Sequence, residues 1–159
     1  MKKLHDQSCR LLIGCLFSGI SLFANGTEAH AENQSESLSL INLIATPERY
    51  DGHLVLVTGH VTVGLENMSI CFMKVNYSSK DCIWLNIDSG PYETEDDRKR
   101  IEKKMKLLNK FNGNVATIEA RFDQNNKGHF GMWSGALKDL VRIYGKNNYH
   151  TFEDKAAQK

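Results

Sequence analysis

Histidines and serines are the residues of this chain whose types could support acid–base or nucleophilic chemistry. His53, His60, His129 and His150 are available as bases, and serines are plentiful. Nucleophilic catalysis needs a nucleophile, a base and an orienting group brought together. The chain has no Gly-x-Ser-x-Gly motif, and Trp133-Ser134-Gly135 is too short a match to predict a nucleophile. Packed or surface histidines are the favoured interpretation, and a small hydrolase with a site centred on His129 is the alternative.

His53 and His60 are candidates for a metal site, but they lie seven residues apart. An odd separation places two side chains on opposite faces of a regular strand. The acidic run at 95–97 is interpreted as the first turn of a helix, where negative charge is stabilising, and not as an acid–base pair. The sequence contains no phosphate-binding loop and no dinucleotide fingerprint. We therefore expect no catalytic residue, no metal and no cofactor.

The N-terminus has the pattern of an export signal. A basic segment ending at Arg10 precedes an apolar stretch over 11–24, and Ala29-His30-Ala31 follows with the small residues that signal peptidase prefers. The pattern predicts a signal peptide over 1–31, a mature chain beginning at Glu32, and a periplasmic or secreted protein. The alternative is lipid anchoring through Cys15, whose preceding residues resemble a lipobox but leave a short apolar core.

Removal of the leader leaves 17 basic and 17 acidic residues, so the mature chain is formally neutral. Nucleic-acid binding depends on a basic surface, which makes nucleic acid an unlikely partner. The mature chain keeps two cysteines, Cys71 and Cys82. In an oxidising compartment such a pair favours a disulfide over a metal site, and we expect the disulfide to join two neighbouring strands.

Hydrophobic patterning predicts a mainly β chain with helices. Ser39 can cap a short helix over 40–45, and Thr94 with Asp97 resembles a capping box at the start of a second helix. Alternating valines make 54–63 the clearest strand, and Gly59 within it indicates a bulge or bend. The other strands are expected at 70–75, 82–87, 115–122 and within 130–144. The expected organisation is a signal peptide over 1–31, a flexible lead-in over 32–37, one domain over 38–145 and a polar tail over 146–159.

Three strands, a helix and two strands are the order of the OB-fold, a five-stranded partly open barrel. Two runs of the sequence also resemble small exported bacterial OB-fold proteins of unknown function. The first is Ala45-Thr46-Pro47-Glu48-Arg49-Tyr50-Asp51-Gly52 leading into Val55, Val57 and Gly59, and the second spans Asn126 to Gly135. The resemblance implies an OB-type β-barrel and carries no activity, so it transfers no catalytic residue.

OB-folds hold extended ligands on the face of their second and third strands and on adjacent loops. Here that surface would include Trp84, His129, Phe130, Trp133 and either Phe72 or Met73, whose rings or thioether could contact a ligand. The alternative is that the two tryptophans are core or rim residues. We therefore expect an exported, non-enzymatic binding module with a protein, peptide or glycan partner, and a single-stranded nucleic-acid-binding protein as an alternative.

Overall fold

The structure is a computed structural model that describes residues 34–74, 78–87 and 94–152. The chain divides into two units, Met1–His30 and Ala31–Lys159, and all the described residues belong to the second. The predicted signal peptide, its cleavage site after Ala31 and the alternative anchor at Cys15 lie outside the described residues.

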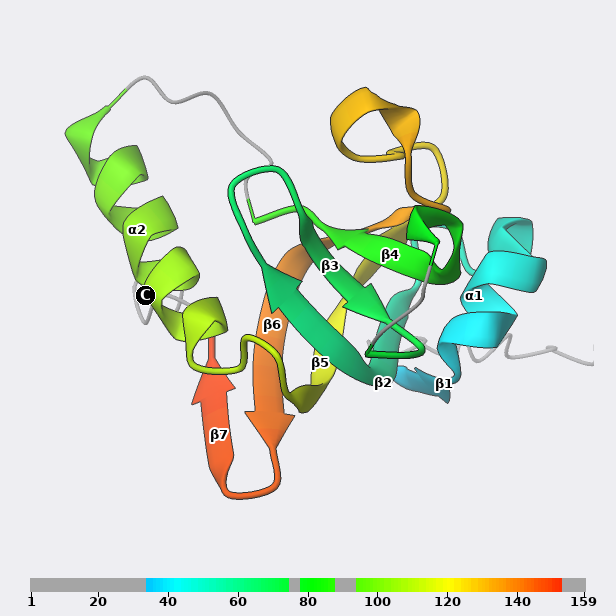
Figure 1. Ribbon diagram of the computed structural model, residues 1–159, viewed down its shortest axis with the longest axis horizontal. Coiled ribbons are helices and arrows are strands. Elements are labelled where there is room, and N and C mark those ends of the chain that lie inside the picture. The colour runs from blue at the N-terminus through cyan, green and yellow to red at the C-terminus, as the bar shows by residue number, and fades with distance from the viewer. Residues whose placement is uncertain (1–33, 75–77, 88–93, 153–159) are drawn as a thin grey trace, which may run out of the picture. The chain divides into compact units, whose positions relative to one another are not determined.

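The described chain is mainly β, as the sequence predicts. Short helices join the strands, and one longer helix, α2, stands between the fourth and fifth strands (Figure 1). In chain order the elements are β1 (Glu36–Leu38), α1 (Leu40–Ala45), η1 (Pro47–Arg49), β2 (Leu54–Val63), β3 (Met68–Cys71), η2 (Ser79–Asp81), β4 (Cys82–Leu85), α2 (Glu95–Asn109), β5 (Val115–Asp123), η3 (His129–Gly131), β6 (Ala136–Gly145) and β7 (Asn148–Thr151).

The strands form one mixed sheet with the order β1-β2-β3-β4-β6-β5, and β7 adds to β6. β1 runs parallel to β2 and β4 runs parallel to β6, whereas the other pairs are antiparallel. β2 also pairs with β5. The pairings of β2, β3, β4, β6 and β5 therefore follow one another in a closed cycle.

β2 links the two halves of this cycle. Its residues 54–60 pair with β5, and residues 60–63 pair with β3. Alternate side chains of β2 are buried, as the period of two predicts. The register of β2 is continuous through Gly59 with both neighbours, so of the expected bulge or bend the bulge is wrong. Gly59 instead allows close packing. A Cβ there would lie 2.7 Å from both the Cys71 carbonyl oxygen and Leu40 Cδ1. The register shift in this sheet lies between β5 and β6, near Glu119 and Arg121.

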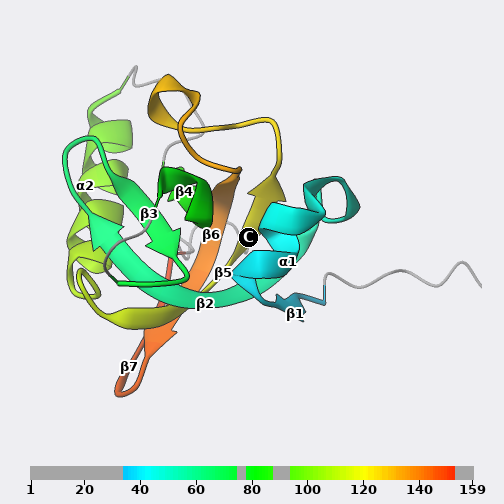
Figure 2. The same ribbon diagram turned by 45° about the vertical axis from the view of Figure 1, so that its right-hand side comes forward.

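Both predicted helices begin at the expected caps. The Ser39 side chain accepts a hydrogen bond from a backbone N–H of α1, which buries Leu40 and Leu43. Thr94 and Asp97 form a reciprocal capping box at the start of α2. α1 and α2 lie on opposite sides of the strands in both views (Figures 1 and 2).

Several predicted boundaries are wrong. β3 covers Met68–Cys71 and not 70–75, and β4 ends at Leu85 and not at 87. The lead-in contains β1, and the beginning of the expected polar tail forms β7 on β6, with Phe152 buried beyond it. These short strands are mostly exposed, so they lack the alternation that reveals a strand in a sequence. β1 and β7 form because their backbones pair with the neighbouring strands β2 and β6.

Cys71 and Cys82 lie directly opposite each other on β3 and β4, at disulfide-bond distance, with Cα atoms 4.2 Å apart. The predicted pairing is therefore confirmed. Their neighbours Ile70 and Ile83 point into the main core, while the cysteines belong to a second buried cluster with Trp133. The disulfide thus lies on the outer face of this hairpin, where the β5–β6 loop covers it.

Candidate functional site

Two tryptophans cover the disulfide. Trp84 comes from β4 and Trp133 from the loop that joins β5 to β6, and their ring centroids are 4.6 Å apart at an angle of 54°. Trp133 is only 3% exposed and Trp84 is half-buried. Apolar contact with the cysteines and with each other fixes the loop to the hairpin. The pair is available to a ligand only at the partly exposed side of Trp84.

Gly128 permits the close approach of this loop to the tryptophans. Its backbone is at φ 65° and ψ −162°, a region that only glycine adopts readily. A Cβ at this position would lie 2.8 Å from atoms of both the Trp84 and Trp133 rings. The loop therefore needs glycine here for two independent reasons, backbone conformation and space.

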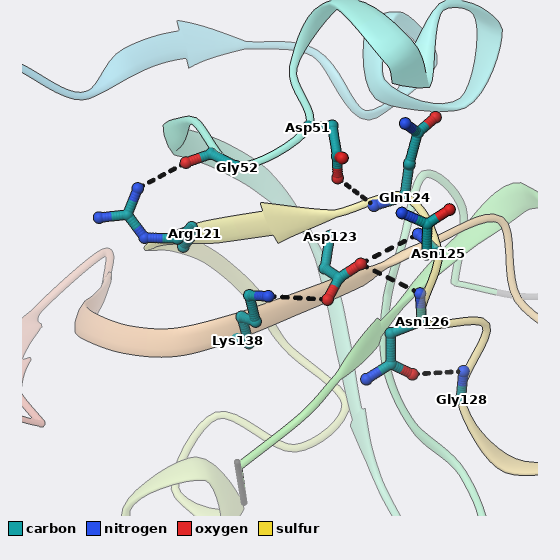
Figure 3. Close-up of polar contacts among 9 residues, drawn as sticks. All are labelled: Asp51, Gly52, Arg121, Asp123, Gln124, Asn125, Asn126, Gly128 and Lys138. Atoms are coloured by element: carbon teal, nitrogen blue, oxygen red, sulfur yellow. Dashed lines mark hydrogen bonds and ion pairs between the residues drawn. The ribbon is translucent and has the colours of Figure 1, made fainter.

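A polar network anchored on Asp123 holds the start of the β5–β6 loop (Figure 3). One carboxylate oxygen of Asp123 accepts hydrogen bonds from the backbone N–H groups of Asn125 and Asn126, at 3.0 and 3.2 Å. The other oxygen forms an ion pair with Lys138 Nζ at 2.8 Å. The hydrogen bond from Lys138 lowers the pKa of Asp123, and Asp123 in turn raises the pKa of the lysine. Both groups are therefore charged at neutral pH.

Further polar contacts extend the network in both directions (Figure 3). The Asn126 side chain accepts from the N–H of Gly128 at 3.0 Å. Asp51, in the turn before β2, accepts from the N–H of Gln124 at 2.9 Å. Lys127 Nζ donates to the carbonyl of Ser134 at 2.6 Å, across the loop. Side chains thus order the loop along much of its length.

The tip of the loop displays two aromatic rings. His129 and Phe130 are stacked with centroids 4.0 Å apart, and Phe130 is 82% exposed. Phe130 has a positive φ of 55°, which a bulky residue rarely adopts. The carbonyl of the following Gly131 accepts a hydrogen bond from Lys80 Nζ at 3.2 Å. An exposed phenyl ring on an ordered loop is suited to contact with a partner.

An apolar groove lies between α1 and the residues that follow β3. Its volume is about 360 Å³, and one acidic side chain, Asp81, stands at its wall. Ile41, Phe72 and Met73 are each about half exposed, although all three are large and hydrophobic. The residues lining this apolar groove are Ile41, Ile44, Ala45, Phe72, Met73 and Asp81.

Residues around η2 connect the apolar groove to the β5–β6 loop. Lys80 bonds to the loop through Gly131, and its own carbonyl accepts a hydrogen bond from the Ser134 hydroxyl at 2.6 Å. The next residue, Asp81, lines the groove, and its carboxylate also accepts from the N–H of Ser78 at 3.0 Å. The groove and the tip of the β5–β6 loop therefore both lie next to the segment around Lys80 and Asp81. Figure 2 shows the ribbon of this loop above the strands and α1 beside them.

The residues expected to contact a ligand do not form a single surface. The structure places them in three separate groups. Trp84 and Trp133 pack over the disulfide, His129 and Phe130 stack at the loop tip, and Met73 lines the apolar groove. Sequence reasoning missed Ile41 and Ile44. The available signal was that four of the six residues of α1 are large and apolar, more than one face of so short a helix can bury.

The contacts of His129 and Ser134 are with other residues of the loop region. The His129 ring stacks on Phe130, and the Ser134 hydroxyl donates to the Lys80 carbonyl. Among residues 34–74, 78–87 and 94–152, no group of three histidine, cysteine or acidic side chains could hold a metal ion. None of the helices in these ranges has both the length and the apolar character needed to cross a membrane.

The described chain is thus a mainly β protein with an ordered loop and an apolar groove on its surface. Comparisons with protein-family models, with curated proteins and with solved structures found no match for it. Its function must therefore be inferred from the geometry of its own residues.

Proposed function

We propose that this protein is an exported, non-enzymatic binding module on an OB-type barrel, and that it binds a peptide segment of a protein partner. The cycle β2-β3-β4-β6-β5, with α2 between its third and fourth strands along the chain, supports the OB-type barrel. The single observation that carries the binding function is the apolar groove beside α1.

The apolar groove is unusual for a protein surface. Large hydrophobic side chains occur singly on most surfaces, whereas contiguous exposed groups mark interaction sites. Ile41, Phe72 and Met73 gather around one hollow and remain about half exposed. Methionine suits such a site because its flexible thioether adapts to different side chains.

The lining of the groove favours a peptide over a glycan. Glycan sites rely on exposed aromatic faces and several polar groups, whereas this groove is mostly aliphatic with Phe72 as its single aromatic residue among those described. Asp81 adds one negative charge at the wall. The expected ligand is therefore a segment with an apolar side chain next to a lysine or arginine, and the exposed Phe130 extends the contact surface.

Two observations support an extracytoplasmic location. The N-terminal residues have the pattern of a cleaved leader. Cys71 and Cys82 stand at disulfide-bond distance, and disulfides persist mainly in oxidising compartments.

Selection of random displayed peptides on the purified mature chain tests the proposal. The selected peptides should carry an apolar residue beside a basic one. Met73→Lys or Ile41→Lys should weaken their binding at least tenfold, because each substitution places a positive charge in the apolar groove, where it also repels the basic residue of the peptide. Leu65→Lys is the matched control, since Leu65 is fully exposed and does not line the groove. Equal binding by the groove variants and the control would refute the proposed site.

A further inference from the structure

The β5–β6 loop carries an exposed apolar tip. In both views the part of this loop that forms η3 projects beyond the strands (Figures 1 and 2). Phe130 at the tip is 82% exposed, and Met132 is about half exposed. Lys80 bonds to the loop, and its neighbour Asp81 lines the apolar groove. One molecule therefore has a projecting apolar group and an apolar hollow next to the same segment of chain.

The backbone of Phe130 is held in a conformation that its side chain disfavours. Its φ of 55° and ψ of 16° lie in the left-handed region, where a bulky residue is an outlier. Hydrogen bonds hold the chain on both sides, from the Gly128 N–H to the Asn126 side chain and from Lys80 to the Gly131 carbonyl. Strain of this kind concentrates at binding sites. The loop thus fixes the direction of a phenyl ring that the described residues of its own molecule leave mostly exposed.

We infer that the Phe130 tip of one copy occupies the apolar groove of a second copy, so that two copies form a closed dimer. The inference rests on the proposed function, because it uses the same groove and names a second copy of the chain as its partner. The loop has the character expected of the ligand, since Phe130 and Met132 are apolar and Lys127 lies close by in the sequence. The groove volume of about 360 Å³ exceeds the roughly 150 Å³ of an apolar cavity that holds benzene.

The closeness of tip and groove favours a dimer over an open chain of molecules. When the tip of the first copy enters the groove of the second, a two-fold axis brings the second tip to the first groove. An open chain would leave a tip and a groove unfilled at its ends. In the dimer each copy contributes the same exposed apolar side chains, which are Ile41, Phe72, Met73, Phe130 and Met132.

The exposed apolar area of these side chains sets the strength of the dimer. Together they expose roughly 500 Å² per copy, at about 200 Å² for a fully exposed large side chain. Two copies would bury roughly 1,000 Å², which is the lower end of the range for specific interfaces. Interfaces of this size are transient. The dimer should therefore dissociate in the micromolar range.

Sedimentation velocity of the mature chain, residues 32–159, tests the inference at concentrations from about 5 to about 500 μM, which bracket such an interface. Phe130→Asp and Met73→Lys should each weaken dimerisation at least tenfold, because each places a charge in the apolar contact. Aspartate tolerates the left-handed region better than phenylalanine, so Phe130→Asp should keep the loop folded. Leu65→Asp is the matched control, since Leu65 is fully exposed and lies outside the groove and the loop. It should change dimerisation less than twofold.

A mixture of the two variants separates a lost contact from a damaged fold. The Phe130→Asp variant keeps an intact groove, and the Met73→Lys variant keeps an intact tip, so one of the two contacts is native in a mixed dimer. In the other contact the introduced aspartate meets the introduced lysine. The mixture should therefore dimerise about tenfold more tightly than either variant alone, because opposite charges are complementary across an interface.

Three results would overturn the inference. The first is a chain that stays monomeric at every concentration, and the second is an equal loss of dimerisation in Leu65→Asp. The third is a mixture that dimerises no better than the separate variants. Peptides that bind the groove of a strictly monomeric chain would refute only the self-association, whereas a chain that dimerises through the groove but selects no peptide would refute only a peptide partner. The two failures are therefore distinguishable.

Discussion

Gly128→Ala should destabilise the fold by about 2–6 kcal/mol. The backbone conformation at φ 65° and ψ −162° costs a residue with a Cβ about 1–3 kcal/mol. The added methyl group would lie 2.8 Å from the rings of Trp84 and Trp133, and overpacking of this kind costs about 1–3 kcal/mol more. Together these costs approach the total stability of an ordinary small domain.

Urea unfolding followed by circular dichroism measures this loss, and the near-ultraviolet signal reports the geometry of the tryptophan pair. Gly113→Ala is the control, because Gly113 also has a positive φ, of 75°, but its Cβ would meet nothing within 4 Å. It should cost only about 1–2 kcal/mol. Addition of Trp84→Leu to Gly128→Ala should recover part of the steric cost, since a smaller side chain opens space. The reasoning is refuted if Gly128→Ala costs no more than Gly113→Ala.

Three further predictions concern the disulfide, the Asp123–Lys138 ion pair and the cleavage of the leader. Replacement of Cys71 and Cys82 together by serine should lower the free energy of unfolding by about 3 kcal/mol, and thiol counting on the denatured, unreduced protein should find no free thiol in the mature chain. Asp123 has a pKa lowered by its hydrogen bond with Lys138, so its stabilising contribution is complete above pH ~4 and is lost as the pH falls through the native pKa; acid unfolding of Asp123→Asn should therefore depend less on pH in this range, and an unchanged profile would contradict the role of the pair. Intact mass of the protein recovered from the cell envelope should correspond to a chain beginning at Glu32, whereas a retained leader would contradict export with cleavage.

Elements with strong local signals were predictable from the sequence. α1 follows a serine cap, α2 follows a capping box, and β2 has alternating valines, so each is specified by residues close together in the chain. β1 and β7 were not predictable, because their mostly exposed residues have no apolar period. They are specified by register against β2 and β6, which only the folded chain provides.

The candidate site was predictable in its parts and not in its arrangement. The sequence pointed to Met73 and Phe130 as exposed contact residues, and to the pairing of Cys71 with Cys82. It did not reveal that α1 turns Ile41 toward the residues after β3, because apolar residues on a short helix look like core material. The groove depends on how tightly α1 approaches β2 over Gly59, which is a tertiary contact.

The pairing of β2 with β5 has a consequence for how this protein behaves at high concentration. A strand with one unpaired side can recruit a strand from another molecule, and long exposed edges promote aggregation. Because the five central strands pair in a cycle, the outermost strands of the described sheet are β1 and β7, with three and four residues. Such short edges present few free backbone groups. The fold therefore resists edge-to-edge association while it keeps an apolar groove exposed.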